Sequence, residues 1–192
     1  MKPIIKIKTA LLLMLFTQLA FASLAQVKYH AKDDLQIVVS GTSTMHDWDM
    51  KTSKGESDAT VTVNADGKLT GVTALHFTVP AESLKSGHKS MDKNAYKTLK
   101  TAAHTDISYV VSAATVQPGG AITCKGKLSI AGTTLDADLM ATGQVNADNS
   151  ISVKGSKKIS MKAFNMIPPT FMLGTVKTGD DVTVQFSLTL TK

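Results

Sequence analysis

The fold class follows from the stretch Val182-Thr183-Val184-Gln185-Phe186-Ser187-Leu188-Thr189-Leu190 near the carboxyl end. Apolar and polar side chains alternate strictly, and because successive side chains of a strand point to opposite faces, the pattern predicts a half-buried β-strand. Residues 122–130 and 135–141 repeat the alternation, and Gly132-Thr133-Thr134 between them is typical of a hairpin turn. The carboxyl-terminal half is therefore predicted to be an antiparallel sheet.

Weaker alternation predicts five further strands, at 35–43, 59–63, 69–79, 107–115 and 151–159. Runs rich in Gly, Asn, Asp and Pro, which favour turns, separate several strands. These runs lie at 64–67, 118–120, 146–149 and 178–181. Because such short connections join antiparallel neighbours, we predict an all-β fold, an eight-stranded antiparallel β-barrel.

One segment has helical periodicity instead. Within residues 90–100, Met91, Ala95 and Leu99 share one face, and four lysines in or next to this segment, Lys89, Lys93, Lys97 and Lys100, fall along another. We expect a short helix packed on the barrel. The lysine stripe is either a solvated face or a surface that steers an anionic ligand or makes transient contact with a membrane.

The charged positions indicate which face of the sheet points inward. The polar faces carry Lys125, Lys127, Asp136, Asp138 and Lys154, which would be costly against lipid, so we expect them to face water. An eight-stranded barrel is either filled by side chains or holds one small ligand. Small inward residues, namely Ala59, Gly71, Ala137, Ala141, Gly143 and Gly155, either leave room for a cavity or mark strand bends and close packing.

The amino terminus has the features of a signal peptide. Lys2, Lys6 and Lys8 precede an apolar run over 10–22 and a small-residue cleavage zone. We predict a signal peptide over residues 1–25, a β-barrel domain over 26–192, and a periplasmic or secreted location. A membrane anchor is the alternative, but it needs about 20 apolar residues.

The amino-acid composition limits the kinds of molecule that the protein is expected to bind. The chain has 21 basic residues, all Lys, and 15 acidic ones, and 3 of the lysines precede the predicted cleavage site. The mature chain would thus have 21 − 3 = 18 lysines, a net charge of +3. Without Arg it lacks the bidentate groups that read phosphates and base edges, so we expect no nucleic-acid partner. Its single cysteine, Cys124, cannot form an intrachain disulfide. The oligomeric state is left open, a homodimer included.

Three segments occur together in an order typical of one family: Ser40-Gly41-Thr42-Ser43-Thr44-Met45-His46-Asp47-Trp48, Ser83-Leu84-Lys85-Ser86-Gly87-His88-Lys89-Ser90-Met91-Asp92 and Phe164-Asn165-Met166-Ile167-Pro168-Pro169-Thr170-Phe171. They resemble the YceI-like family, and the similarity continues through the 126–132 hairpin and the last strand. The resemblance implies a lipocalin-like eight-stranded barrel, exported from the cytoplasm. It also implies an elongated apolar pocket for a polyisoprenoid, an isoprenoid quinone or a similar long-chain lipid.

The segment 161–173 is too apolar for an ordinary loop, and its prolines cannot extend a ladder. We interpret it as an irregular lid over one end of the barrel, with a hydrophobic plug as the alternative. The inward residues of the strands are core by default and become ligand contacts if a cavity exists. The candidate ligand-binding residues are Trp48, Phe77, Tyr109, Ile130, Leu139, Phe164, Met166, Ile167, Phe171 and Met172. A polar head group could contact His46, Asp47 and His88.

The sequence offers no sign of a cofactor, a metal site or catalysis. The histidines form no H-E-x-x-H pair, and nucleophile elbows, phosphate loops and C-x-x-C pairs are absent. The leading hypothesis is a non-enzymatic exported protein that encloses a long-chain amphiphilic lipid for sequestration or transport. The alternatives are a structural or interaction barrel with a filled core, and a hydrolase or isomerase of hydrophobic substrates.

Overall fold

The computed structural model describes residues 26–33 and 35–192. The predicted signal peptide, residues 1–25, lies outside the described residues, as does the Met172 side chain. The strands are β1 (Gln26–Lys32), β2 (Leu35–Ser43), β3 (Trp48–Thr52), β4 (Glu56–Val63), β5 (Leu69–Pro80), β6 (Asp106–Val116), β7 (Ala121–Ile130), β8 (Thr133–Val145), β9 (Ile151–Ser160), β10 (Thr170–Phe171) and β11 (Val176–Leu190). The helical elements are α2 (Lys89–Leu99) and the 3₁₀ turns η2 (Ala81–Ser83), η3 (Lys162–Phe164) and η4 (Met172–Gly174).

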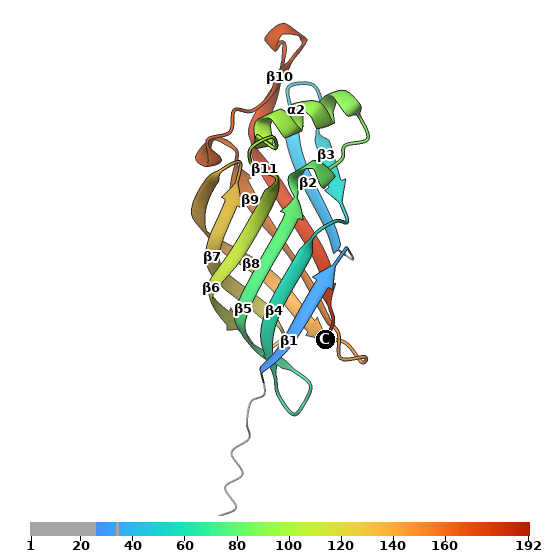
Figure 1. Cartoon of the computed structure of the whole chain (residues 1–192), viewed down its shortest axis with the longest axis vertical. Coiled ribbons are helices and arrows are strands. Elements are labelled where there is room, and N and C mark those ends of the chain that lie inside the picture. Colours follow the sequence, from blue (N-terminus) through green and yellow to red (C-terminus); the bar gives the residue numbers. More distant parts are fainter. Residues whose placement is uncertain (1–25, 34) are drawn as a thin grey trace, which may run out of the picture.

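All strands belong to one antiparallel sheet with the order β1-β4-β5-β6-β7-β8-β9-β11-β2-β3, and β10 pairs with β11. The sheet curls strongly, so that its strands surround a common interior (Figure 1). The predicted all-β antiparallel fold with one short α-helix is confirmed. The strand count was too low, because the described sheet has 11 strands rather than eight.

The strands that the sequence reading missed are β1, β3 and β10. β3 has five residues and β10 has two, too few for alternation to be distinctive. The 178–181 segment was also misread as a turn. It lies inside β11, where the pairing register with β2 shifts between Thr178 and Val182, so the same Gly and Asp residues form a bulge.

The two edges of the sheet are fastened at opposite ends. At one end, His30 of β1 exchanges two backbone hydrogen bonds with Thr191, with N···O distances of 2.8 and 2.9 Å. At the other, Lys51 of β3 exchanges two with Lys85, also at 2.8 and 2.9 Å. The second contact brings the segment that follows η2 against the β3 edge and places α2 across that end of the barrel (Figure 1).

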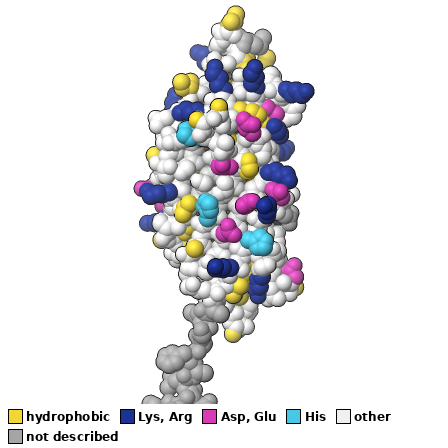
Figure 2. Space-filling model, viewed as in Figure 1, with side chains coloured by type: hydrophobic (Ala, Val, Ile, Leu, Met, Phe, Trp, Pro, Cys, Tyr) yellow, Lys and Arg dark blue, Asp and Glu magenta, His cyan; other side chains and the backbone are white. Residues whose placement is uncertain are grey.

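The alternating pattern puts apolar side chains inside and charges outside. The main core cluster includes Leu35, Val61, Tyr109 and Ile151, which are all buried. The predicted outward residues Lys125, Lys127, Asp136, Asp138 and Lys154 are exposed. Charged side chains are scattered over the outer wall (Figure 2). Among the described residues, no helix has the length and apolar character required to cross a membrane.

Helix α2 is tied down at both of its ends. Near its start, Asp92 accepts hydrogen bonds from the backbone N–H and the hydroxyl of Ser86, at 2.8 and 2.7 Å. Near its end, the Tyr96 hydroxyl lies 2.8 Å from the Glu82 carbonyl oxygen, and Thr101 Oγ1 donates to Glu82 Oε1 at 2.7 Å. The predicted apolar face, with Met91, is half-buried, and the four lysines are exposed.

Candidate functional site

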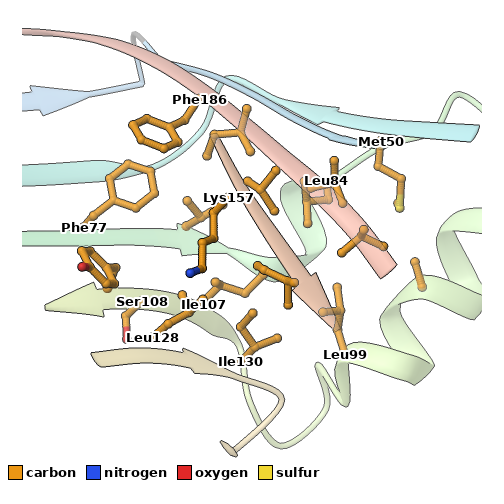
Figure 3. A pocket seen from close by; sticks show the side chains of 18 of the residues that line it. Met50, Phe77, Leu84, Leu99, Ile107, Ser108, Leu128, Ile130, Lys157 and Phe186 are labelled. Carbon is orange, nitrogen blue, oxygen red and sulfur yellow. The ribbon is translucent and has the colours of Figure 1, made fainter. Parts of the chain in front are cut away.

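The interior of the barrel contains a cavity of about 570 Å³. Its volume lies within the range of small-molecule sites, about 300–1,000 Å³. Most lining side chains are aliphatic or aromatic, and they come from the barrel strands and from the inner face of α2 (Figure 3). The exposed residues Met45, His46 and His88 also line it, so the cavity reaches the surface beside the start of α2. We call this opening the cavity mouth.

Most of the predicted ligand-binding residues line this one cavity. They are Trp48, Phe77, Tyr109, Ile130, Leu139, Met166 and Phe171. The curled sheet brings them together from β3, β5, β6, β7, β8 and the 161–173 segment. Of the predicted head-group residues, His46 and His88 lie at the mouth. A role in ligand binding remains a prediction for all of them.

The structure places three predicted site residues away from the cavity wall. Phe164 is buried in a second cluster with Ile130, Ile159 and Met166, because the 3₁₀ turn η3 directs it toward the ends of β8 and β9. Ile167 and Asp47 are exposed in loops and line no part of the cavity. Within the 161–173 segment, Phe164 is therefore part of the packed core, whereas Met166 and Phe171 line the cavity, and the role of the segment as lid or plug stays a prediction.

Two glycines of the barrel strands, Gly155 and Gly126, pack against aromatic rings rather than leave empty space. An ideal Cβ on Gly155 would lie 2.3 Å from Phe186 Cζ, and one on Gly126 would lie 2.7 Å from Tyr109 Cζ. These distances are far below van der Waals contact, so neither position accepts a larger residue without movement. Of the small residues predicted to face inward, Gly155 therefore fits the second interpretation, close packing, and the cavity persists beside it.

Tyr109 places a hydroxyl on the otherwise largely apolar wall of the cavity. Its hydroxyl donates to the Ala137 carbonyl oxygen at 2.9 Å and lies 3.3 Å from that of Cys124. Burial raises the pKa of Tyr109 to about 12, with smaller effects from Cys124 and Asp138. Burial also raises the pKa of the Cys124 thiol. Both groups therefore stay neutral at neutral pH, which suits contact with hydrocarbon.

Lys157 and Ser57 are among the polar residues of the wall that the sequence reading missed. Lys157 has the same strand parity as the inward residues Ile151, Val153 and Ile159, and this parity could have identified it. Its Nζ donates to the Asp138 carbonyl oxygen at 2.7 Å. Ser57 is 2% exposed, and its Oγ has no hydrogen-bond partner among the described residues.

The histidines at the mouth are not paired with a nucleophile. His46 Nδ1 lies 2.8 Å from the backbone oxygen of Asp47, while the Ser43 and Ser86 hydroxyls bond backbone atoms of His46 and His88. Within the described part of the chain, no group of three or more His, Cys, Asp or Glu side chains is placed to hold a metal ion. The arrangement is that of an enclosure with an apolar wall.

The model of the YceI-like domain matches residues 22–190, almost the whole chain. The chain belongs to the YceI-like family. No curated protein matches it significantly in sequence.

Solved structures with the same fold are distant in sequence from this YceI-like protein. BcnA of Burkholderia cenocepacia is 17% identical, with a TM-score of 0.65, over 82% of this chain and 96% of that chain. A polyisoprenoid-binding domain from Saccharophagus degradans is 11% identical, with a TM-score of 0.62, over 86% of this chain and 98% of that one. The Campylobacter jejuni YceI protein is 16% identical, with a TM-score of 0.55, over 71% and 81%.

The segments that carry the family resemblance meet at the cavity mouth. Residues 40–48 join β2 to β3, residues 83–92 lead from η2 into α2, and residues 164–171 lead from η3 into β10. Each of them contributes lining residues, among them Trp48, His88 and Phe171. The segments with family resemblance therefore form the entrance to the cavity, while the deeper wall consists of the inward-facing side chains of the alternating strands.

Proposed function

We propose that this YceI-like protein is an exported, non-enzymatic binding protein that encloses a long-chain amphiphilic lipid for sequestration or transport. The ligand is a polyisoprenoid, an isoprenoid quinone or a fatty-acid derivative. The observation that carries the proposal is the apolar cavity of about 570 Å³ that opens at one end of the barrel. The printed name of the Saccharophagus degradans domain, polyisoprenoid binding, supports the same ligand class. The leader-like amino terminus supports export.

The energetics of such a complex are favourable. Each CH₂ removed from water contributes about 0.8 kcal/mol, so about 15 enclosed carbons give a gross gain of roughly 12 kcal/mol. Immobilising the chain offsets much of this gain. Micromolar or tighter binding therefore needs no more than a continuous apolar wall.

The two alternatives have less support. A barrel with a filled core is disfavoured by the cavity itself. A hydrolase would need an activated nucleophile, whereas the Ser43 hydroxyl bonds the His46 backbone, and the Ser86 hydroxyl bonds the His88 backbone and the Asp92 carboxylate. The geometry therefore favours binding over catalysis.

Native mass spectrometry of the protein purified from its own export pathway tests the proposal, followed by organic extraction of any bound molecule. A matched pair of variants on β8 separates the cavity from the outer wall. Leu139→Trp fills the cavity that Leu139 lines, while Met140→Trp adds the same ring to a side chain that is 71% exposed. We expect a stoichiometric lipid in the wild type and in Met140→Trp, and none in Leu139→Trp. A ligand-free mass that stays unchanged after incubation with quinones and polyprenols would overturn the proposal.

A further inference from the structure

The cavity contains one ammonium group. Lys157 lies on the inward face of β9, and its side chain extends into the cavity that Phe77, Ile107 and Leu128 also line (Figure 3). It is the one lysine among the described lining residues, and none of them is Asp or Glu. The ion pairs found within the described part of the chain do not include Lys157 either. Among the residues that the structure describes, none supplies this cation with a counter-ion.

A local opening of the sheet explains where the ammonium rests. The β8–β9 ladder ends at the pair Met140 and Ser156, so the Asp138 carbonyl lies beyond the paired region. Lys157 Nζ reaches this oxygen at 2.7 Å. An ammonium has three N–H donors, and this bond uses one of them. Two donors remain for a group inside the cavity.

A charge held against apolar side chains is unfavourable unless an opposite charge joins it. Because the lining contains no carboxylate, the missing anion has to come from the ligand. Ser57, whose buried Oγ is unpartnered among the described residues, adds a free hydrogen-bonding atom to the cavity lining. The wall therefore suits a ligand whose inner end is polar and negatively charged.

We propose that Lys157 binds the anionic head group of the lipid, a carboxylate or a phosphate, so that the lipid enters head first and its tail points toward the cavity mouth. This inference rests on the proposed function and specifies its ligand class. Neutral isoprenoid alcohols would still occupy the cavity, but more weakly. The competing role for Lys157 is purely structural, as a cap on the Asp138 carbonyl.

Three ligands with the same tail separate these roles: farnesoic acid, farnesyl monophosphate and farnesol. Binding to delipidated protein is followed by isothermal titration calorimetry. Lys157→Met keeps the hydrocarbon stem and removes the charge and donors, while Lys157→Gln keeps a donor for Asp138 without the charge. Lys154→Met, an exposed lysine on the same strand, is the matched control.

We expect the wild type to bind at least one of the two anionic ligands about tenfold or more tightly than farnesol, as for a charge-assisted hydrogen bond. Both Lys157 variants should lose this preference and keep their affinity for farnesol, and Lys154→Met should behave as the wild type. Preference for the acid or for the phosphate identifies the head group. Equal binding of all three ligands by the wild type would overturn the role of Lys157 and leave the proposed function standing. Binding of none would overturn both.

An independent feature lies at the cavity mouth. Of the five large hydrophobic side chains exposed in the described part of the chain, Met45 (66% exposed) lines the mouth, and Ile167 (84%) and Leu173, which is fully exposed, lie on segments next to it. Hydrogen bonds hold their segments together, since Thr44 N donates to the Lys177 oxygen at 3.0 Å and Thr178 N donates to the Pro169 oxygen at 3.1 Å. We call these three residues the apolar rim.

Leu173 is unusual for two reasons. Its φ of 56° lies in the left-handed region that disfavours residues other than Gly and Asn. Its side chain is also fully exposed to solvent. A Gly or Asn would be more favourable than Leu at an exposed position with a positive φ. The stability of the free protein therefore does not explain the leucine.

Lysines accompany the apolar rim. Lys89, Lys93 and Lys97 on α2 and Lys100 at its carboxyl-terminal cap are exposed, and the ion pairs found among the described residues leave all four without a carboxylate partner. Basic and apolar side chains share this end of the molecule (Figure 2). Apolar residues beside a lysine-rich helix face combine the two signals that bind proteins to anionic bilayers.

We infer that the apolar rim inserts into the head-group region of an anionic membrane while the α2 lysines contact the lipid head groups. This docking sets the cavity mouth against the bilayer, where a lipid can pass without crossing water. Each lysine near an anionic surface adds to the attraction, and salt weakens it.

Sedimentation with phosphatidylcholine vesicles, with and without phosphatidylglycerol, tests the docking. We expect binding to the anionic vesicles, at least about tenfold weaker for Lys93→Glu/Lys97→Glu. Ile167→Glu/Leu173→Glu should also release the protein. The matched controls, Lys125→Glu/Lys154→Glu and Val110→Glu/Met140→Glu on the outer wall, should bind as the wild type does. Absence of vesicle binding by the wild type, or equal losses in the controls, would overturn the inference.

Discussion

Replacing Gly41 by alanine should displace the only tryptophan of the chain. Gly41 lies beneath the Trp48 ring, and an ideal Cβ there would be 2.3 Å from Cζ2, 2.7 Å from Cε2 and 3.0 Å from Cη2. Carbon atoms in contact prefer about 3.5–4.0 Å, so the ring has to move by roughly 1 Å or more. That movement strains the hydrogen bond from Trp48 Nε1 to the Thr42 carbonyl oxygen, which is 3.1 Å long.

The expected cost follows from these contacts. Forced overpacking lowers the free energy of unfolding by about 1–3 kcal/mol. Trp48 is half-buried and can tilt toward solvent, so we expect about 2 kcal/mol, the middle of that range. For a domain of this size, such a loss lowers Tm by about 4–8 °C. Because Trp48 lines the cavity mouth, the same change should also weaken ligand binding.

Urea denaturation followed by circular dichroism measures the cost, and Trp48 emission reports the displaced ring. Gly71→Ala is the matched control, since its Cβ would meet Thr62 Oγ1 at an ordinary 3.4 Å. The control should be neutral or stabilising by up to about 1 kcal/mol. In a Trp48→Leu background, Gly41→Ala should cost less than about 0.5 kcal/mol. An unchanged cost in that background would show that the ring does not pack on Gly41.

Three further predictions concern the groups with shifted pKa values. The pKa of Tyr109 is raised to about 12 from its ordinary value of 10.0, so its contribution to stability is complete below pH 10.0 and is lost as the pH rises to about 12. In urea titrations over that pH range, the difference in free energy of unfolding between the wild type and Tyr109→Phe should shrink. A constant difference would contradict the burial argument. Hydrogen bonds from the Ser86 hydroxyl and N–H lower the pKa of Asp92 below 3.8. Asp92→Asn should therefore speed hydrogen exchange in α2 at neutral pH, and the difference from the wild type should vanish in acid, where the wild-type carboxyl is protonated. Similar exchange rates of the two proteins at neutral pH would refute this prediction. Burial raises the pKa of Cys124 on the cavity wall, so N-ethylmaleimide should label this thiol slowly. Labelling should be slower still with lipid bound. A labelling rate that lipid does not change would place the ligand elsewhere.

The sequence predicts the fold well where alternation is long and regular. The bounds predicted for β2 match the structure, and the strong 182–190 pattern forms the greater part of β11. Prediction fails where the signal is short or ambiguous. β1 follows directly on the cleavage zone, and its partner β4 is distant in the sequence. The Gly and Asp residues of 178–181 fit a turn and a bulge equally well, and only the pairing with β2 decides between them.

The cavity was predictable in outline but not in shape. Parity alone identifies inward residues such as Phe77 and Leu139, which the curled sheet then brings to one wall. The parity of positions along a strand does not predict that Phe186 fills the space above Gly155, because that contact depends on the register between β9 and β11. It also does not tell that η3 turns Phe164 away from the cavity. Loops without periodicity are decided by tertiary packing, so Ile167 and Phe164 were the least predictable residues of the site.

The division between entrance and wall bears on how ligand choice arises in this chain. The family-like segments 40–48, 83–92 and 164–171 surround the cavity mouth, so their resemblance to the family concerns access to the barrel. Lys157 and Ser57 lie on the wall outside these segments, at positions that simple strand alternation could fill with any apolar residue. If the head group binds at Lys157, proteins with the same entrance can differ in the lipid they hold through single inward residues. Exchanging Lys157 should then change the preferred head group while delivery at the mouth, which depends on the apolar rim and α2, stays intact.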